Sequence, residues 1–435
     1  MQSIRWPDVS CPIPSSFPAT SAGRSRRFYG LLASLKLAAL AAFATLLAIS
    51  TVSAPARAQD DGQSLVYRIG YVHLDNDPRL GGPRTFMEIP VAPLGAALRG
   101  AEVALIDSEL MGRQLGIDFQ LQVARNDNLN ALALIIEGWV AEGINFVVAD
   151  LPAAQLASLA GALESLPVTF FNVSADDDEL RGAGCRANLI HAVPSQSMMT
   201  DAVTQFLSDR RWRDVLLLRG PAEADRALAD AFERSAIRAG LRVVEVRDYV
   251  LSVDTSISAL TAGEDYDVVF VADAFGAFAN LVPYETREAR PVVGAAGLVP
   301  LGWHWSWSRA GASGLNARFE FHADRRMGTT DWAAWISVSA IVQAVFRART
   351  ESGEGGDAPI THEALLSNLL SQDADFDGAK GTPLTVRPWD QQLRQPVLLA
   401  THNRVVARAP LDGFVHPAND LDTLGIGAER SECRL

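Results

Sequence analysis

The sequence predicts an α/β protein with two lobes, each a parallel β-sheet covered by helices on both faces. Three observations support this fold class. Short apolar runs typical of buried strands alternate with longer segments of helical period from residue 66 onward. The connections between these segments are short, as in β-α units. The alternation starts again near residue 195, which indicates a second sheet of the same kind and not an extension of the first.

The first sheet is expected from a run of β-α units. Its last strand, VTFFNV at 168–173, is apolar at nearly every position, which is typical of a strand buried on both faces. The helix at 129–143 ends at Gly143, a common helix-terminating residue. The expected strands are 66–73, 117–124, 145–150 and 168–173, and the expected helices are 95–110, 129–143 and 152–165.

The second lobe repeats the pattern and is followed by a more helical region. Ser195 is expected to cap the first helix of this lobe. A strand-turn-strand is expected near the C-terminus, with its turn at His402 and Asn403. The expected strands are 214–220, 241–249, 267–273 and 290–297, and the expected helices are 195–210, 221–240, 255–263, 329–350 and 361–370.

Residues 1–58 have the features of a secretory signal peptide. Three arginines between positions 24 and 27 precede a nearly uncharged apolar run at 31–49. The segment ends in Ala-Arg-Ala, so we expect cleavage near Ala58 and export to the periplasm. The alternative is a membrane anchor, because the apolar run is close to spanning length.

Export has consequences for charge and for the cysteines. The segment carries six basic residues and one acidic residue, so its removal changes the formal net charge from −13 to −18. Such an acidic protein is poorly suited to nucleic acid or anionic membranes, and better suited to small cations or ammonium-bearing ligands. Cys185 and Cys433 remain, and we expect one disulfide between them; two free thiols are the alternative.

Polar and acidic residues follow several expected strands. Ligands of open α/β sheets bind outside the carboxyl ends of the strands, so these positions are candidate ligand contacts. The alternative for each acid is a structural one, because Asp and Ser commonly cap helices and acids complement a helix dipole. The candidates are Asp75 and Asp77 after the first strand, Asp150 after the third, Ser174, Asp176, Asp177 and Asp178 after the fourth, and Asp273 in the second lobe.

The segment GWHWSW at 302–307 places three tryptophans at a period of two, which predicts one face of a strand. Such a face is usually core, and an aromatic box around an organic or cationic ligand is the alternative, with Trp303 and Trp305 as its members. Trp332, Trp335 and Trp389 are expected in the core.

No catalytic motif accompanies these candidates. The sequence contains no G-x-S-x-G, HExxH or P-loop motif, and its histidines are scattered without metal-ligand spacing. After cleavage the chain has a single lysine, Lys380, which is too little to argue for Schiff-base chemistry. We therefore expect a protein that is not an enzyme and has no cofactor and no metal centre.

Several stretches make the chain resemble a known family. They are LRGAGCRANLIHAVPS (180–195), FLSDRRWRDVLLLRGP (206–221), GWHWSWSRAGASGLNARFE (302–320), KGTPLTVRPWDQQLRQPVLL (380–399) and LDTLGIGAERSECRL (421–435). The chain resembles type I periplasmic solute-binding proteins of the leucine/isoleucine/valine-binding class. Within that class it resembles the substrate-binding proteins of presumed ABC transporters found with PQQ-dependent alcohol dehydrogenase systems.

The resemblance implies two Rossmann-like lobes joined by a three-crossover hinge that closes on the ligand. It places the N-terminal lobe at 64–192 and 301–380 and the C-terminal lobe at 193–300 and 381–435. It implies ligand contacts from Asp150, Ser174, Asp176, Gly220 and Asp273. The loop after the third strand reads ADLPAAQ (149–155), where amino-acid binders of this class are rich in Ser and Thr. Because a carboxylate would be repelled by Asp150, a branched-chain amino acid is not the expected ligand.

The expected function is capture of a small solute for an inner-membrane ABC permease, linked to PQQ-dependent alcohol oxidation, by a monomer. The ligand could be an alcohol-derived compound, a PQQ-related species or a hard cation held by aspartates. The alternatives are a periplasmic sensor without transport, an accessory subunit of a quinoprotein alcohol dehydrogenase, or a metal-cation-binding protein.

Overall fold

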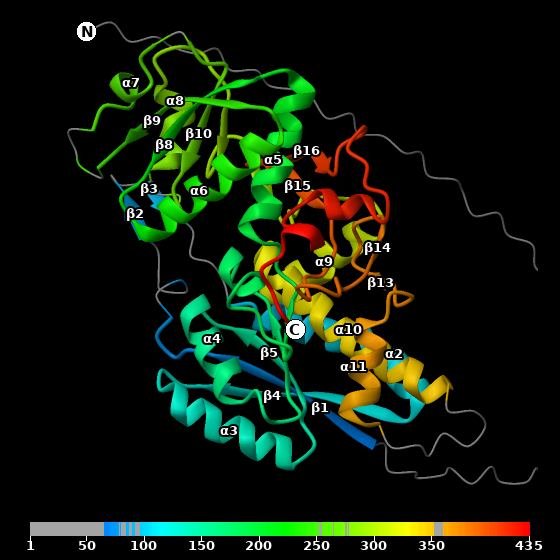
Figure 1. Cartoon of the computed structure of the whole chain (residues 1–435). Coiled ribbons are helices and arrows are strands. Elements are labelled where there is room, and N and C mark those ends of the chain that lie inside the picture. Colours follow the sequence, from blue (N-terminus) through cyan, green and yellow to red (C-terminus); the bar gives the residue numbers. More distant parts are fainter. Residues whose placement is uncertain are drawn as a thin grey trace, which may run out of the picture. The chain divides into compact units, whose positions relative to one another are not determined.

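The structure is a computed structural model, shown in Figure 1. It describes residues 65–435 except 78, 80–83, 87–88, 92–95, 251, 253–254, 264, 275, 277 and 352–359. The expected signal peptide lies outside the described residues.

The first sheet has five parallel strands in the order β4-β1-β5-β6-β7. Every residue of β5 and β6 is buried, because helices cover both faces of the sheet. Its strands are β1 (Leu65–His73), β4 (Ile117–Arg125), β5 (Phe146–Asp150), β6 (Thr169–Asn172) and β7 (Leu189–His191), and its connecting helices are α2 (Leu98–Leu115), α3 (Leu129–Ala141) and α4 (Ala153–Ala162).

Each face of this sheet has its own apolar core. One face packs against α3 and α4, and the other packs against α2 and the long α10 (Thr329–Glu351). Helices α9 (Ala312–Ala323) and α11 (His362–Leu370) join the second core. At Gly100 an added Cβ would lie 1.9 Å from the Asp331 carbonyl oxygen, so α2 and α10 approach closely only because this residue is glycine.

The second sheet is also parallel, with the strand order β11-β10-β8-β9. Helices α5 and α6 cover one face, and a smaller apolar cluster around Tyr249 and Phe278 covers the other. Its strands are β8 (Asp214–Arg219), β9 (Arg242–Asp248), β10 (Val268–Ala272) and β11 (Val292–Gly294), and its helices are α5 (Gln196–Arg210), α6 (Glu223–Arg238), α7 (Ile257–Leu260) and α8 (Val282–Glu285). The predicted α/β fold class with parallel sheets is confirmed.

A third, antiparallel sheet has the order β12-β15-β16 and shares the core of α5 and α6. Its hairpin turns at His402 and Asn403, as predicted. Its strands are β12 (Val299–Leu301), β15 (Val397–Thr401) and β16 (Arg404–Ala409); the two remaining pairs are β2 (Arg84–Phe86) with β3 (Ile89–Val91) and β13 (Phe376–Asp377) with β14 (Pro383–Leu384).

The predicted strand at 302–307 is wrong, because the chain leaves β12 at Leu301 and turns. The amide of Trp307 donates to the carbonyl of His304, which closes the turn. The Asn316 side-chain amide donates to the carbonyls of Trp305 and Trp307 at 2.9 Å each. The three alternating tryptophans therefore lie in a turn that the Asn316 side chain stabilises. A short strand would show the same alternation in sequence.

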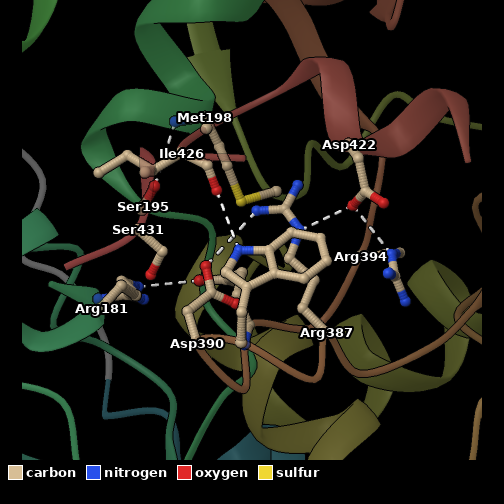
Figure 2. Close-up of polar contacts among 12 residues, drawn as sticks. Arg181, Ser195, Met198, Arg387, Asp390, Arg394, Asp422, Ile426 and Ser431 are labelled. Carbon is tan, nitrogen blue, oxygen red and sulfur yellow. Dashed lines mark hydrogen bonds and ion pairs between the residues drawn. The ribbon is translucent and has the colours of Figure 1, made fainter. Parts of the chain in front are cut away.

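Hydrogen bonds hold residues 387–394 against the end of the first sheet and against the C-terminal segment. Backbone hydrogen bonds join His191 to Gln391 and Leu393. Nearby, the guanidinium groups of Arg387 and Arg394 both donate to Oδ1 of Asp422 at 2.9 Å, and all three residues are buried (Figure 2). The lobe boundaries stay a prediction.

The C-terminal segment is tied back to the first sheet. Cys185 and Cys433 form a disulfide with their Cα atoms 5.5 Å apart, across 248 residues of sequence. The bond and the Asp422 ion pairs fix the last residues of the chain against the crossovers. Among the described residues, no helix is long and apolar enough to span a membrane.

Candidate ligand-binding site

Asp150 ends β5 at the carboxyl edge of the first sheet, where it is only 2 % exposed. Its carboxylate accepts hydrogen bonds from the Tyr71 hydroxyl, the Ala97 amide and the Arg79 guanidinium, each at 3.2 Å. Pro152 caps α4 without a side-chain hydrogen bond, and the carboxylate of Asp150 bonds elsewhere. The alternative role for Asp150 as a cap of that helix is therefore wrong.

Arg79 joins Asp150 to a second buried acid. Its Nε lies 3.0 Å from both carboxylate oxygens of Asp77, and its Nη2 lies 3.2 Å from Asp150. Burial opposes ionisation of Asp77, but the hydrogen bonds and charge of Arg79 outweigh it and lower the pKa of Asp77. At this edge the positive charge of Arg79 partly compensates the negative charges of Asp77 and Asp150. A ligand carboxylate would therefore be repelled less than the charge of Asp150 alone predicts.

A second ion pair lies against this one. Asp331, in the first turn of α10, accepts from both Nη atoms of Arg325 at 2.6 and 2.7 Å. Burial, with a smaller contribution from Asp150, raises the pKa of Asp331 although Arg325 opposes the shift. The same two acids, after burial, raise the pKa of Tyr71. Two guanidinium groups thus face three carboxylates at this edge.

The loop after β6 carries Ser174 and the three aspartates. The side-chain oxygen of Asn172 accepts from the amides of Ser174 and Ala175, and the Ser174 hydroxyl donates to the Leu151 carbonyl at 3.3 Å. Ser174 and Asp177 form no capping box, since Asp177 has no side-chain capping bond. This loop lies beside the end of β5, so Ser174 and Asp150 belong to neighbouring positions on one edge.

The aspartates of this loop meet the start of α5 in the second run of elements. Asp178 accepts from the amide and the hydroxyl of Ser197, and Asp176 accepts from the Gln196 side chain at 3.4 Å. Burial and the charge of Asp177 raise the pKa of Asp176 to about 6. The aspartates therefore stabilise a helix N-terminus, that of α5, which begins 20 residues after Asp176.

The second sheet supplies Gly220 and Asp273. Asp273 follows β10 and accepts from the amides of Gly276, Phe278 and Ala279 at 3.0, 2.8 and 2.9 Å. Burial raises the pKa of Asp273 against these hydrogen bonds, and Asp225 adds to the shift. Gly220 follows β8, and an added Cβ there would lie 2.2 Å from Oδ2 of Asp225.

Asp75 and Trp303 lie apart from these groups. Asp75 is exposed and pairs with Arg125 at 3.3 Å. Trp303 is 1 % exposed in the first core, stacks on Trp332, and donates from Nε1 to the Asn316 side chain at 3.0 Å. Among the described residues, no group of three or more His, Cys, Asp or Glu is arranged to hold a metal ion.

The basic partners of the site were not predicted from the sequence. Arg79 and Arg325 pair with its acids, and Arg181 donates to backbone carbonyls of the loop after β6; only Arg181 lies within a stretch singled out for the resemblance. The sequence around an arginine that lies outside the expected strands does not indicate which acid it will pair with. Arg79 and Asp150 are 71 residues apart, so the tertiary fold brings them together, whereas Arg325 and Asp331 are only 6 residues apart.

Comparison with known proteins was made by sequence and by structure. No family model matches the sequence, and no curated protein is significantly similar to it. Many solved structures share the fold.

Three of these structures are periplasmic or solute-binding proteins. A branched-chain amino-acid ABC transporter periplasmic ligand-binding protein from Burkholderia xenovorans has a TM-score of 0.64 at 13 % identity, covering 84 % of this chain and 98 % of that one. A leucine-, isoleucine-, valine-, threonine- and alanine-binding protein from Brucella ovis, in a closed conformation, has a TM-score of 0.59 at 15 % identity, covering 84 % and 96 %. An ABC transporter solute-binding protein from Rhodopseudomonas palustris, in complex with benzoate, has a TM-score of 0.58 at 14 % identity, covering 85 % and 99 %. The chain has the type I periplasmic binding protein fold of these structures.

Proposed function

We propose that this chain is the periplasmic substrate-binding component of an ABC transporter and holds a small solute between its two lobes. The observation that carries the proposal is the placement of polar residues at the carboxyl ends of both parallel sheets. Asp150 and Ser174 follow strands of the first sheet, and Asp273 follows a strand of the second, where Gly220 follows the neighbouring strand β8. In a fold of this kind those edges are where a ligand binds.

The chemistry of the first edge favours a polar organic solute. Arg79 can donate to an acceptor on the ligand, and Asp77 and Asp150 can accept from a hydroxyl or amine. The side chain of Arg79 is 23 % exposed, whereas those of Asp77 and Asp150 are nearly inaccessible. A ligand would thus meet Arg79 first and reach the carboxylates only by sharing or displacing its hydrogen bonds.

We further propose an exported protein, cleaved near Ala58, that serves PQQ-dependent alcohol oxidation. This link has its support in the sequence stretches that resemble binding proteins of such systems, most of all 180–195 and 421–435. In the structure these two stretches are joined by the Cys185–Cys433 disulfide, which suits an oxidising compartment. The solute would then be an alcohol-derived compound or a PQQ-related species.

A thermal-shift screen of residues 59–435 against alcohols, aldehydes, carboxylates, PQQ and metal ions tests the proposal. We expect one organic class to raise the melting temperature in a concentration-dependent way, without turnover of the compound. Asp150→Asn and Asp273→Asn should each weaken binding in calorimetry. Asp248→Asn is the control, because Asp248 is exposed and pairs with Arg219. Unchanged affinity in both edge variants would contradict the proposed site, and co-purification with a dehydrogenase without any solute would favour an accessory subunit.

A further inference from the structure

A separate pocket of about 480 Å³ lies outside the candidate ligand-binding site, along β16. It is lined by β16 itself, by the turn after β12 and by Gly381. Its size is within the range of small-molecule sites in proteins. None of the candidate contacts at the carboxyl ends of the two parallel sheets lines it.

Arginines give this pocket its character. Arg309, Arg404 and Arg408 all line it, and in the described part of the chain none of their guanidinium groups has a hydrogen bond or an ion pair. The Nε of Arg408 is buried and has no partner, which leaves a donor unmet. Most other arginines of this acidic chain pair with a carboxylate, as Arg242 does with Asp214.

The floor of the pocket is rigid. The Ser306 hydroxyl accepts from the Val405 amide at 3.0 Å and lies 2.8 Å from Nδ1 of His304. The Trp307 indole donates to the Ala379 carbonyl at 2.9 Å. These bonds fix the turn after β12 against β16, so the lining does not depend on a ligand to hold it together.

Lys380 also lines the pocket. Lys380 is fully buried, and its Nζ donates to the Gln395 side chain at 2.7 Å and lies 3.5 Å from the centre of the Trp332 ring. No carboxylate pairs with it among the described residues. Burial, with a smaller effect of the Arg408 charge, lowers the pKa of Lys380. None of the residues that line the pocket is acidic.

We propose that this pocket binds a small organic anion with at least two carboxylate or phosphate groups. Guanidinium groups match such oxyanions in shape and charge, and their hydrogen bonds to them are among the strong ones in proteins. Arg404 and Arg408 are four residues apart on β16, with a register shift at Val406 between them, so their Cα atoms are at most about 13 Å apart. Three guanidinium groups that have no acidic partner within the described ranges favour a ligand with several anionic groups over a single oxyanion, because each anionic group can then take its own bidentate partner. β16 is the outer strand of its sheet, so no neighbouring strand closes the pocket.

Calorimetry on residues 59–435 with citrate and with pyrophosphate tests this site, with sodium chloride at matched ionic strength as the reference. We expect saturable binding of one or both probes. Arg404→Gln and Arg408→Gln should each weaken it about tenfold. Arg242→Gln should leave the affinity unchanged, because Arg242 is already paired and lies on the second sheet.

The two probes separate the sources of the anion. Binding of citrate alone assigns a polycarboxylate, and binding of pyrophosphate alone assigns a phosphate ester. No saturable binding above the chloride reference, or equal affinity in Arg404→Gln and wild type, overturns the proposal. Should Arg408→Gln fail to fold, Arg404→Gln decides, because its side chain is exposed. Asp150→Asn should bind the probe normally, so failure of the site proposed between the lobes is distinguishable from failure here.

Discussion

Replacing Arg181 by methionine should destabilise the protein by about 3 kcal/mol. Arg181 is 3 % exposed and donates four hydrogen bonds of 2.9 Å, to the carbonyls of Ala175, Asp177 and Val193 and to the side-chain oxygen of Gln392. Methionine keeps the aliphatic part of the side chain and removes all four donors.

The size of the expected loss of stability depends on which hydrogen-bond donors each acceptor keeps when Arg181 is removed. Ala175 keeps a donor from Asn172, and Val193 keeps one from Gln392. Among the described residues, the Oε1 of Gln392 has no second donor, and leaving this buried oxygen unpaired costs about 1–3 kcal/mol. The loop aspartates and Asp390 lose one compensating charge, although Asp178 keeps Arg234 and Asp390 keeps Arg387. Breaking a buried charge arrangement costs about 3–5 kcal/mol in total. Burial also lowers the pKa of Arg181, which shows that burying its charge is unfavourable. Because the substitution removes this cost, we expect a loss of stability at the lower end of that range.

Urea unfolding of residues 59–435, followed by tryptophan fluorescence with the disulfide intact, measures this difference. Arg186→Met is the matched control: its side chain is 33 % exposed and pairs with Glu164, so it should change stability by less than about 1 kcal/mol. A loss below about 1 kcal/mol for Arg181→Met would refute the claim that this residue holds the loop to the crossovers.

Three further changes test separate parts of the structure. The pKa of Asp176 is about 6 in the folded protein and lower in the unfolded chain, so its contribution to stability is full at low pH and is lost as the pH rises through about 6. Asp176→Asn should therefore raise stability at pH 7.5 and leave it nearly unchanged at pH 4, and denaturation midpoints at the two values check this. Cys433→Ser opens the link to Cys185 and should cost about 2–4 kcal/mol in chemical unfolding; a cost near zero would mean that the C-terminal segment is held by its ion pairs alone. Gly220→Ala should lower the melting temperature, since its Cβ has no room, while Gly138→Ala in α3, where no atom lies within 4 Å of the added Cβ, should raise it.

The strands and helices of both parallel sheets could be predicted because their apolar patterns are local. β5 and β10 are apolar at nearly every position and buried throughout, and the predicted ranges match them closely. The same logic failed at 302–307, where three alternating tryptophans lie in a turn held by Asn316. The spacing of apolar residues cannot distinguish a strand from such a turn, because the turn is stabilised by a side chain of the later helix α9.

The candidate site could be predicted only in part, and for a similar reason. The acids Asp150 and Asp273 follow strands, so their position at the sheet edges follows from the order of elements. Their partners do not: Asp150 bonds to Arg79 and to the start of α2, and Asp273 bonds to the turn that follows it. The role of Asp178 depends on how the loop after β6 meets Ser197 at the start of α5, 19 residues later, which the apolar pattern does not indicate.

Small-angle X-ray scattering of residues 59–435, titrated with the solute found in the thermal-shift screen, tests the central claim most directly. A solute held between two hinged lobes should reduce the radius of gyration, and the decrease should saturate at one equivalent. A radius of gyration that stays constant while calorimetry shows the protein to be saturated would contradict binding between the lobes.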